Sequence, residues 1–238
     1  MKGSTALNHL KASKINVAID GPAGAGKSTV ARMVAERLGY VYVDTGAMYR
    51  AVTLKALREG VPDDERERLT ALAEKTDIRL VVHPDGQRVM MDGEDVTEQI
   101  RSAEVTSRVS AVAAVPALRS VLVALQRAMA EDKGVVMDGR DIGTNVLPQA
   151  EVKVFLTASV RVRAERRWKE IKGKQPGVTL ESLMDAIEKR DRSDSERETS
   201  PLRRADDAVE IDTSNLHIDE VVDRILALCR TSLGGRAR

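Results

Sequence analysis

The chain has 238 residues, of which 42% are hydrophobic and 32% are charged, the composition of a soluble globular protein with one full core. Its 38 Lys and Arg residues against 37 Asp and Glu residues leave a net charge of +1, so no global field recruits nucleic acid or an anionic membrane. Aromatic residues make up only 2%, too few for a platform that stacks single-stranded nucleic acid. We therefore expect small molecules as partners.

The N-terminal segment and the cysteine content indicate a compartment. Residues 1–14 contain no long apolar run, so we expect a flexible leader and neither a signal peptide nor a membrane anchor. Cys229 is the single cysteine and cannot form an internal disulfide, which is typical of a reducing environment. The sequence therefore predicts a cytoplasmic protein.

The first predicted strand, at about 15–20, runs directly into a phosphate-binding motif and then into a predicted helix. The motif fits G-x-x-x-x-G-K-[ST] and consists of Gly21, Pro22, Ala23, Gly24, Ala25, Gly26, Lys27, Ser28 and Thr29. In such a P-loop, backbone N–H groups and the following helix N-terminus bind phosphate oxygens. We predict nucleoside triphosphate binding, with Lys27 at the β- and γ-phosphates and the Ser28 hydroxyl on Mg²⁺.

Strands and helices alternate along the rest of the chain. After a short strand at 40–43 and a helix at about 47–58, the predicted strands are 135–137, 152–156 and 208–211, with helices beginning near 160, 180 and 218. Such alternation is typical of a parallel sheet wrapped by helices. We therefore predict an α/β chain with the three-layer P-loop fold.

One stretch, at about 63–100, interrupts this alternation. Segments 78–82 and 88–91 have strand character, and the residues between them (His83-Pro84-Asp85-Gly86-Gln87) form a predicted turn. Asp92-Gly93 predicts a second turn. We interpret the stretch as an inserted antiparallel β lobe, either decorative or closing over a second substrate.

Four polar groups could surround a second ligand. Asp44-Thr45-Gly46 leads into Arg50, and Asp138-Gly139-Arg140-Asp141 follows an apolar strand, so both stand where open α/β sheets bind ligands. Two helical faces carry the other groups, namely Arg163, Arg166 and Arg167, and Arg190, Asp194 and Arg197. Arginines suit an acceptor phosphate, although charges at helical spacing also occur as a solvated face.

A P-loop alone does not distinguish GTPases, motor ATPases and small-molecule kinases. The chain has no N-K-x-D segment for reading guanine, and no predicted strand ends in the Asp-Glu pair of many motor ATPases. The arginine groups favour phosphoryl transfer to a second anion, which depends on positioning and charge neutralisation.

Four segments together resemble the bacterial cytidylate kinases, which are nucleoside monophosphate kinases. They are IDGPAGAGKST, VDTGAMYR, MDGRDIGT and KRDRSDSER, and the resemblance extends over about residues 15–230, including the insertion. It implies the reaction of ATP with CMP or dCMP to give ADP and CDP or dCDP, with Mg²⁺ accompanying ATP. Position 28 is Ser here, where glycine is common in the family, so this chain keeps a hydroxyl for the metal.

The resemblance also implies roles for individual residues. ATP would be bound by Gly21 to Thr29 and covered by a lid at about 160–178 bearing Arg163, Arg166 and Arg167. The catalytic residues would be Lys27, Arg140, Arg163 and Arg197. CMP would be bound by Thr45, Arg50, Ser110, Arg119, Asp138, Arg140, Asp141, Arg190, Asp194 and Arg197, among which Ser110, Arg119 and Asp141 would read cytosine.

Two other classes of function remain open at this stage. A kinase acting on a hydroxyl, such as that of shikimate or dephospho-coenzyme A, would use Asp44 or Asp138 as a base. A non-enzymatic regulator would use the P-loop to switch partners. We further expect a monomer, since the net charge is near zero and the sequence predicts no exposed apolar stripe, and a flexible tail at 231–238. We also expect the lobe and the lid to close over both nucleotides.

Overall fold

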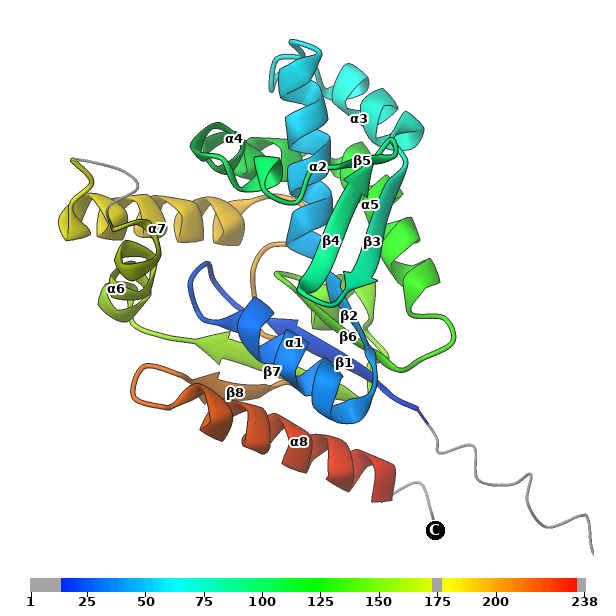
Figure 1. The fold of residues 1–238 in the computed structure, drawn as a ribbon, viewed down its shortest axis with the longest axis vertical. Coiled ribbons are helices and arrows are strands. Elements are labelled where there is room, and N and C mark those ends of the chain that lie inside the picture. The colour runs from blue at the N-terminus through cyan, green and yellow to red at the C-terminus, as the bar shows by residue number, and fades with distance from the viewer. Residues whose placement is uncertain (1–13, 173–176, 235–238) are drawn as a thin grey trace, which may run out of the picture.

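The computed structural model describes residues 14–172 and 177–234. Its main sheet has the strand order β2-β6-β1-β7-β8, and every neighbouring pair is parallel. The strands are β1 (Asn16–Asp20), β2 (Val41–Asp44), β6 (Val135–Gly139), β7 (Val152–Thr157) and β8 (Val209–Asp212). The predicted parallel sheet wrapped by helices is confirmed (Figure 1).

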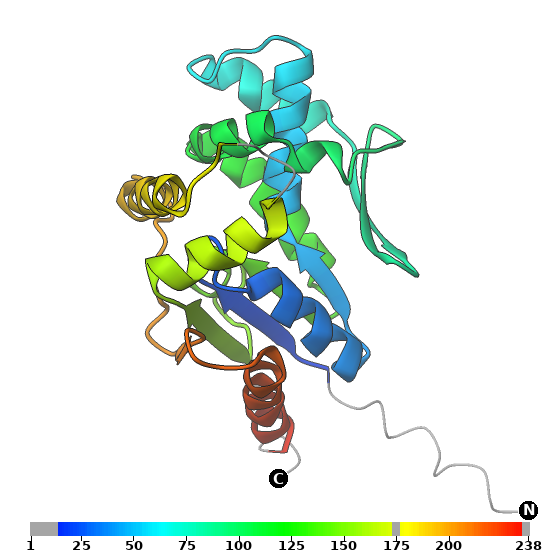
Figure 2. The same ribbon diagram turned by 60° about the vertical axis from the view of Figure 1, so that its left-hand side comes forward.

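Helices cover both faces of this sheet, which is why its central strands are apolar throughout. Every residue of β1 and β6 is buried. On one face, α1 (Lys27–Leu38) and α8 (Ile218–Gly234) share a core with β1 and β7 (Figures 1 and 2). On the other face, α5 (Pro116–Met129) and the short π-helix η2 (Ile142–Val146) pack against β1, β2 and β6. These are the three predicted layers.

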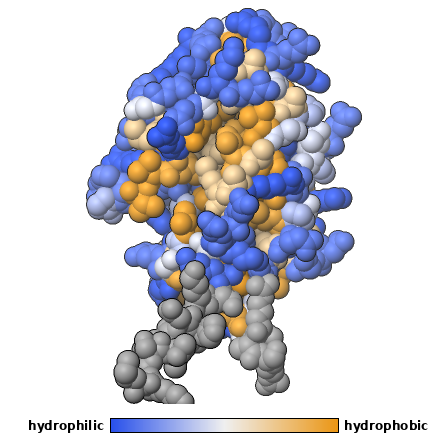
Figure 3. Space-filling model, turned by 90° about the vertical axis from the view of Figure 1, so that its right-hand side faces the viewer, coloured by the Kyte–Doolittle hydropathy of each residue, from blue (hydrophilic) through white to orange (hydrophobic). Residues whose placement is uncertain are grey.

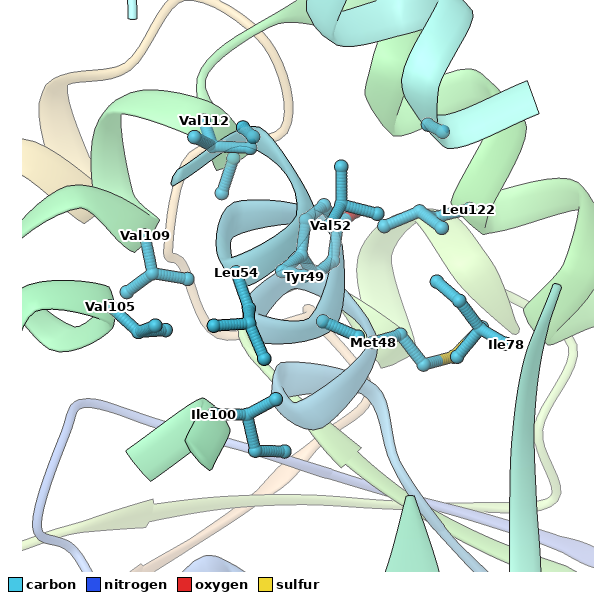
Figure 4. Packing of buried hydrophobic residues seen from close by; sticks show 14 of the residues in the cluster. Met48, Tyr49, Val52, Leu54, Ile78, Ile100, Val105, Val109, Val112 and Leu122 are labelled. Atoms are coloured by element: carbon cyan, nitrogen blue, oxygen red, sulfur yellow. The ribbon is translucent and has the colours of Figure 1, made fainter. Parts of the chain in front are cut away.

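The upper half of the molecule is a lobe with its own core (Figure 1). It is built from α2 (Thr45–Arg58), α3 (Arg66–Lys75), β3 (Ile78–His83), β4 (Gly86–Met91), β5 (Glu94–Asp95), η1 (Gln99–Arg101), α4 (Ala103–Ala113) and α5. Figure 4 shows Met48 and Tyr49 of α2 at its centre, between Val109 of α4 and Leu122 of α5. Since α2 begins at the end of β2, this core fixes the helix that carries Arg50 beside the sheet.

The predicted antiparallel hairpin is confirmed, because β3, β4 and β5 form an antiparallel three-stranded sheet. The first part of the 63–100 stretch is nevertheless helical, and α3, α4 and α5 were not predicted. Residues 231–234 were expected in a flexible tail, but they continue α8 because Leu233 packs against the lower core. The expected leader 1–13 and the tail residues 235–238 lie outside the described residues, as do 173–176 of the expected lid.

Two helices complete the fold beside the sheet. Helix α6 (Val160–Ile171) follows β7, and α7 (Leu180–Glu196) packs against α6 and approaches α4 of the lobe (Figure 2). Because α7 contacts both α6 and α4 of the lobe, it joins the two parts of the chain that flank the carboxyl ends of the strands.

We expect the buried residues of the lobe core to contribute strongly to the free energy of unfolding. Leu118 on α5 is fully buried, so Leu118→Ala should lower the free energy of unfolding by about 2–5 kcal/mol through lost burial and a cavity. Leu125 on the same helix is 38% exposed, so Leu125→Ala serves as the control and should cost about 1 kcal/mol or less. Urea unfolding of both variants measures the difference. Equal losses would contradict this description of the core.

One face of the molecule exposes apolar side chains (Figure 3). Val81 and Val82 on β3 are 44% and 79% exposed, and Leu125 on α5 is 38% exposed, and both elements lie on this side in Figure 1. These side chains go against the expectation of no exposed apolar stripe, which was one of two grounds for the monomer prediction; the other was the near-zero net charge.

In residues 14–172 and 177–234, no single helix combines the length and the apolarity needed to span a membrane; only α4 and α5 meet that test as a pair, and they meet at a bend of 99°.

Candidate active site

A cleft opens at the carboxyl ends of β1, β2 and β6, between the sheet, the lobe and α7. It brings together all ten predicted CMP-binding residues, namely Thr45, Arg50, Ser110, Arg119, Asp138, Arg140, Asp141, Arg190, Asp194 and Arg197. Four P-loop residues line the same cleft, namely Ala23, Gly24, Lys27 and Ser28. Among the described residues that line it, seven are cationic and four are acidic, so the cleft favours anions.

The loop before α1 has the backbone conformation that its glycines permit. Gly24 and Gly26 have φ of 78° and 89°, the left-handed region that other residues rarely adopt. A Cβ on Gly24 would also stand 3.1 Å from the Arg163 Cβ. Helix α1 begins at Lys27, immediately after this turn, so its N-terminal N–H groups and dipole point into the cleft.

Lys27 and Asp138 lie in the buried floor of the cleft. Lys27 Nζ donates to Pro22 O at 2.8 Å, and burial together with the charge of Arg140 lowers the pKa of this amine. Burial and then the nearby Asp44 raise the pKa of the Asp138 carboxyl. Its two oxygens accept from the hydroxyls of Ser28, at 3.0 Å, and Tyr42, at 2.8 Å. Asp138 thus connects the P-loop to β2.

Arg119 and Asp141 form a buried ion pair deeper in the cleft. Arg119 Nη2 lies 2.5 Å from Asp141 Oδ2, and their side chains are only 3% and 6% exposed. Asn145 Nδ2 donates to the same oxygen at 3.0 Å. The Arg119 guanidinium also lies over the Tyr49 ring, 5.2 Å from its centroid, which favours the cation. This arrangement offers one fixed donor and one fixed acceptor side by side.

Arginines from four elements surround the rest of the cleft. Arg140 Nε donates to Asp194 Oδ2 at 2.8 Å, while Arg50 Nη1 donates to Ile100 O at 3.1 Å. Three buried guanidinium nitrogens have no hydrogen-bond partner among the described residues: Nε of Arg119, Nε of Arg190 and Nη2 of Arg197, the last of which lies 3.6 Å from Asp141 Oδ1 as an ion pair. Burial, and then the charge of Arg140, lowers the pKa of Arg190 to about 10. Unpartnered buried N–H groups of this kind favour an anionic ligand.

The three arginines expected on one lid face diverge. Arg163 is 4% exposed and donates to the P-loop carbonyl Ala23 O at 3.1 Å, and it lies 2.6 Å from Asp191 of α7. Arg166 turns to the loop after β8 and donates to Thr213 O at 2.7 Å. Arg167 is 42% exposed and pairs with Glu170. None of the three lines the cleft with the acceptor-side residues, so their role toward ATP stays a prediction.

Sequence reasoning missed the contacts that connect the lobe to the sheet. Gln87 of β4 donates through Nε2 to Tyr42 O at 2.6 Å, and its Oε1 accepts from Asp44 N at 3.4 Å. Its amide thereby pairs with the free backbone edge of β2, as a neighbouring strand would. The same stretch of β2 leads into Thr45, whose hydroxyl donates to Asp138 O at 2.7 Å. Strand pattern alone carries no signal for such a contact.

Gln87 should therefore affect the acceptor side of the cleft. Gln87→Leu removes both hydrogen bonds, and the loss of about 1 kcal/mol from one such bond corresponds to about a fivefold rise in KM for the acceptor nucleotide. We expect kcat to change by less than about twofold. Gln99→Leu, which alters another amide of the lobe that contacts Glu94, is the control for steady-state kinetics. An unchanged KM in Gln87→Leu would contradict the role of this contact.

Comparison with known proteins decides the family. The sequence model of the cytidylate kinase family matches residues 17–231. The chain belongs to this family. Cytidylate kinase of Geobacillus kaustophilus is 56% identical over 221 residues, which cover 93% of this chain and 99% of that protein. Cytidylate kinase of Bacillus subtilis is 54% identical over 213 residues, covering 90% and 95%. As a member of the family, the chain is a kinase, and the predicted resemblance is confirmed.

A solved structure supports the fold alone. The crystal structure of an uncharacterized protein from Eubacterium ventriosum has a TM-score of 0.50 with 14% identity, covering 92% of this chain and 99% of that chain. At that identity it carries no information about substrates. The function of this cytidylate kinase family member is therefore argued from its sequence relatives and from its own cleft.

Proposed function

We propose that the chain transfers the γ-phosphoryl group of ATP to CMP or dCMP, giving ADP and CDP or dCDP. One observation carries the proposal: the buried Arg119–Asp141 pair and the unpartnered arginine nitrogens face one cleft, beside the P-loop. The first offers a donor and an acceptor for a base, and the second offers N–H groups for a phosphate. No observation favours the hydroxyl-acceptor kinase or the regulator.

The P-loop and Lys27 would act on ATP. The backbone N–H groups of 23–29 would hold the β- and γ-phosphates, and the Lys27 ammonium would stabilise the charge that develops on the transferring group. Since phosphate oxygens beside Lys27 favour its charged form, ATP binding would counteract the effect of burial on its pKa. We assign Arg163 to holding the loop against α7, and Arg166 and Arg167 to the ATP side of the lid.

The donor set beside the P-loop fits Mg²⁺. Ser28 Oγ and Asp138 Oδ2 lie 3.0 Å apart and are hard oxygen donors of the kind this ion prefers. Bound there with ATP, Mg²⁺ would neutralise negative charge on the β- and γ-phosphates. Tyr42 would keep the Asp138 carboxylate oriented through its other oxygen.

The acceptor phosphate would be held by Arg50, Arg140 and Arg197. An oxygen of this phosphate attacks the γ-phosphorus, the bond from that phosphorus to the bridging oxygen breaks, and ADP leaves with the electron pair. The acceptor is already an oxyanion, so no general base is required. Arg140 and Arg197 would neutralise charge in the transition state, while Arg190 and Asp194 would hold the sugar.

Cytosine matches the inner part of the cleft. Its exocyclic amine donates, so the Asp141 carboxylate and the Ser110 hydroxyl can accept, while Arg119 donates to the ring acceptors. Uracil has an acceptor where cytosine has the amine, so it would place an oxygen against the Asp141 carboxylate in place of a donor. CMP and dCMP share this edge, and both are therefore proposed substrates.

The domain boundaries, the oligomeric state and the compartment follow from the same function. We propose a kinase domain over about 15–230, extended to Gly234 by the end of α8, in which the inserted stretch 63–100 of the lobe and the lid at about 160–178 close to exclude water. Scattering curves that are identical with and without a bisubstrate analogue would contradict closure.

A monomer is proposed because one chain supplies the described lining of the cleft. We place it in the cytoplasm, where ATP and CMP occur and where the single buried Cys229 stays reduced.

The direct test of the proposed function is product analysis. The purified chain with Mg²⁺, ATP and CMP should form CDP and ADP in equal amounts, as phosphorus NMR or ion-exchange chromatography would show. Formation of ADP without CDP would contradict the proposal, because ATP would then be hydrolysed rather than used for transfer.

A further inference from the structure

Asp20, the last residue of β1, is a buried carboxylate that the function described so far does not use. It is 5% exposed and stands immediately before the P-loop. Its Oδ1 accepts from Ile142 N at 2.8 Å, and its Oδ2 accepts from Gly143 N at 2.7 Å. Two short bonds therefore connect the start of the ATP loop to the start of η2, 122 residues further along the chain.

Both of these N–H groups are among the first of η2, which have no partner within the helix, and Gly143 N, at the second helical position, is one that an N-cap side chain ordinarily bonds. The residue at the N-cap position of η2 is Asp141, a residue type that usually caps through its own carboxylate. Its side chain makes no cap hydrogen bond. It points instead to Arg119 Nη2, at 2.5 Å, and to Asn145 Nδ2, at 3.0 Å. Asp20 of β1 thus bonds the N-terminal N–H groups of η2, while the Asp141 carboxylate is directed to Arg119, Asn145 and, at 3.6 Å, Arg197 in the cleft.

We propose that Asp20 is a positioning residue for base recognition: by capping η2 in place of Asp141, it holds the Asp141 carboxylate toward the acceptor base. The inference rests on the proposed function, in which Asp141 reads cytosine. Without the cap from Asp20, the Asp141 side chain would satisfy its own helix N-terminus and turn from the base.

The electrostatics around Asp20 agree with this role. Burial raises the pKa of the Asp20 carboxyl to about 6, although the bonds from Gly143 and Ile142 partly offset this. Both of its oxygens accept backbone N–H groups, as those of an ionised carboxylate do. Lys27 is also near enough to interact with this charge, although more weakly than the groups that bond Asp20 directly. A test must therefore separate the two substrates.

Asp20→Asn keeps the shape but replaces one acceptor oxygen with an N–H donor that faces a backbone N–H. We expect KM for CMP to rise about tenfold and the preference for CMP over UMP in kcat/KM to fall about tenfold, with KM for ATP within about twofold. Asp92→Asn is the matched control, since Asp92 also accepts a backbone N–H, from Asp77, but lies in the lobe away from the cleft. The control should keep the wild-type preference.

The decisive readout is a double-mutant cycle with Asp141→Asn. If Asp20 acts through Asp141, adding Asp20→Asn to Asp141→Asn should not lower the base preference further. Additive losses would overturn the inference, and so would an unchanged preference in Asp20→Asn or equal rises in KM for both nucleotides. A wild-type chain without preference for CMP would instead refute the proposed base reading itself, so the two failures are distinguishable.

A second variant covers the case in which Asp20→Asn does not fold. A Cβ on Gly143 would lie 3.4 Å from Asp20 Oδ2 and 3.2 Å from Lys153 Cδ, so Gly143→Ala disturbs the same contact from its other side. Gly143→Ala should also lower the preference for CMP over UMP, but by less than Asp20→Asn does. Thermal melting confirms that each variant is folded, and a folded Gly143→Ala with full preference would count against the inference.

Discussion

Lys27→Ala should lower kcat by about 10²–10³-fold while the chain remains folded. The expected loss is that of a preorganised charge aimed at the transferring group. Lys27 is only 6% exposed, and burial together with Arg140 disfavours its ammonium, so its removal should leave the melting temperature unchanged or raise it. The measurements are turnover at saturating ATP and CMP, and thermal unfolding.

Lys75→Ala is the control for Lys27→Ala, since Lys75 is an exposed lysine on α3. It should leave both kcat and the melting temperature unchanged. Turnover of Lys27→Ala within about tenfold of the wild type would contradict the assignment of Lys27 to the transferring phosphoryl group.

Arg119→Met should reduce both stability and the use of CMP. Its side chain and that of Asp141 are 3% and 6% exposed, so removing the arginine leaves a buried carboxylate without its nearest cation, with Arg197 at 3.6 Å as the remaining one. Breaking such a pair costs about 3–5 kcal/mol, measured by urea unfolding. The loss of a donor to cytosine should also lower kcat/KM for CMP by about 10²-fold, mostly through KM.

A second substitution separates these two effects of Arg119. In Arg119→Met/Asp141→Leu, the buried carboxylate is removed together with its nearest cation, so part of the stability should return, while Arg197 loses its 3.6 Å ion pair with Asp141. CMP use should stay low, since both the donor and the acceptor for the base are gone. Restored CMP use in the double variant would show that Arg119 and Asp141 act only on stability and would contradict the proposed base reading.

The sequence predicts the parts of this molecule that depend on neighbours in the chain. The P-loop between β1 and α1, and the Asp138–Asp141 segment at the end of β6, are local patterns, and both lie where they were expected. The β3–β4 hairpin was predicted for the same reason, from its turn residues. Arg119 and Ser110 have no such local signal, and only the family resemblance directed attention to them.

The parts that were missed depend on contacts between distant segments. Tyr42 meets Asp138 across 96 residues, Gln87 meets Tyr42 across 45, and Asp20 meets Ile142 across 122. Helical spacing also predicted that Arg163 and Arg166 share one face. In the structure, Arg163 pairs with Asp191 of α7, whereas Arg166 donates to Thr213 after β8. Periodicity identifies a face of a helix but does not identify the neighbour that buries it.

The measurement that tests the central claim most directly is kcat/KM for a panel of acceptors with Mg²⁺ and ATP: CMP, dCMP, UMP, AMP, GMP, shikimate and dephospho-coenzyme A. Binding of cytosine by Arg119 and Asp141 predicts that CMP and dCMP exceed every other acceptor by at least about tenfold. A hydroxyl acceptor that matched CMP, or ADP formation independent of any acceptor, would contradict it.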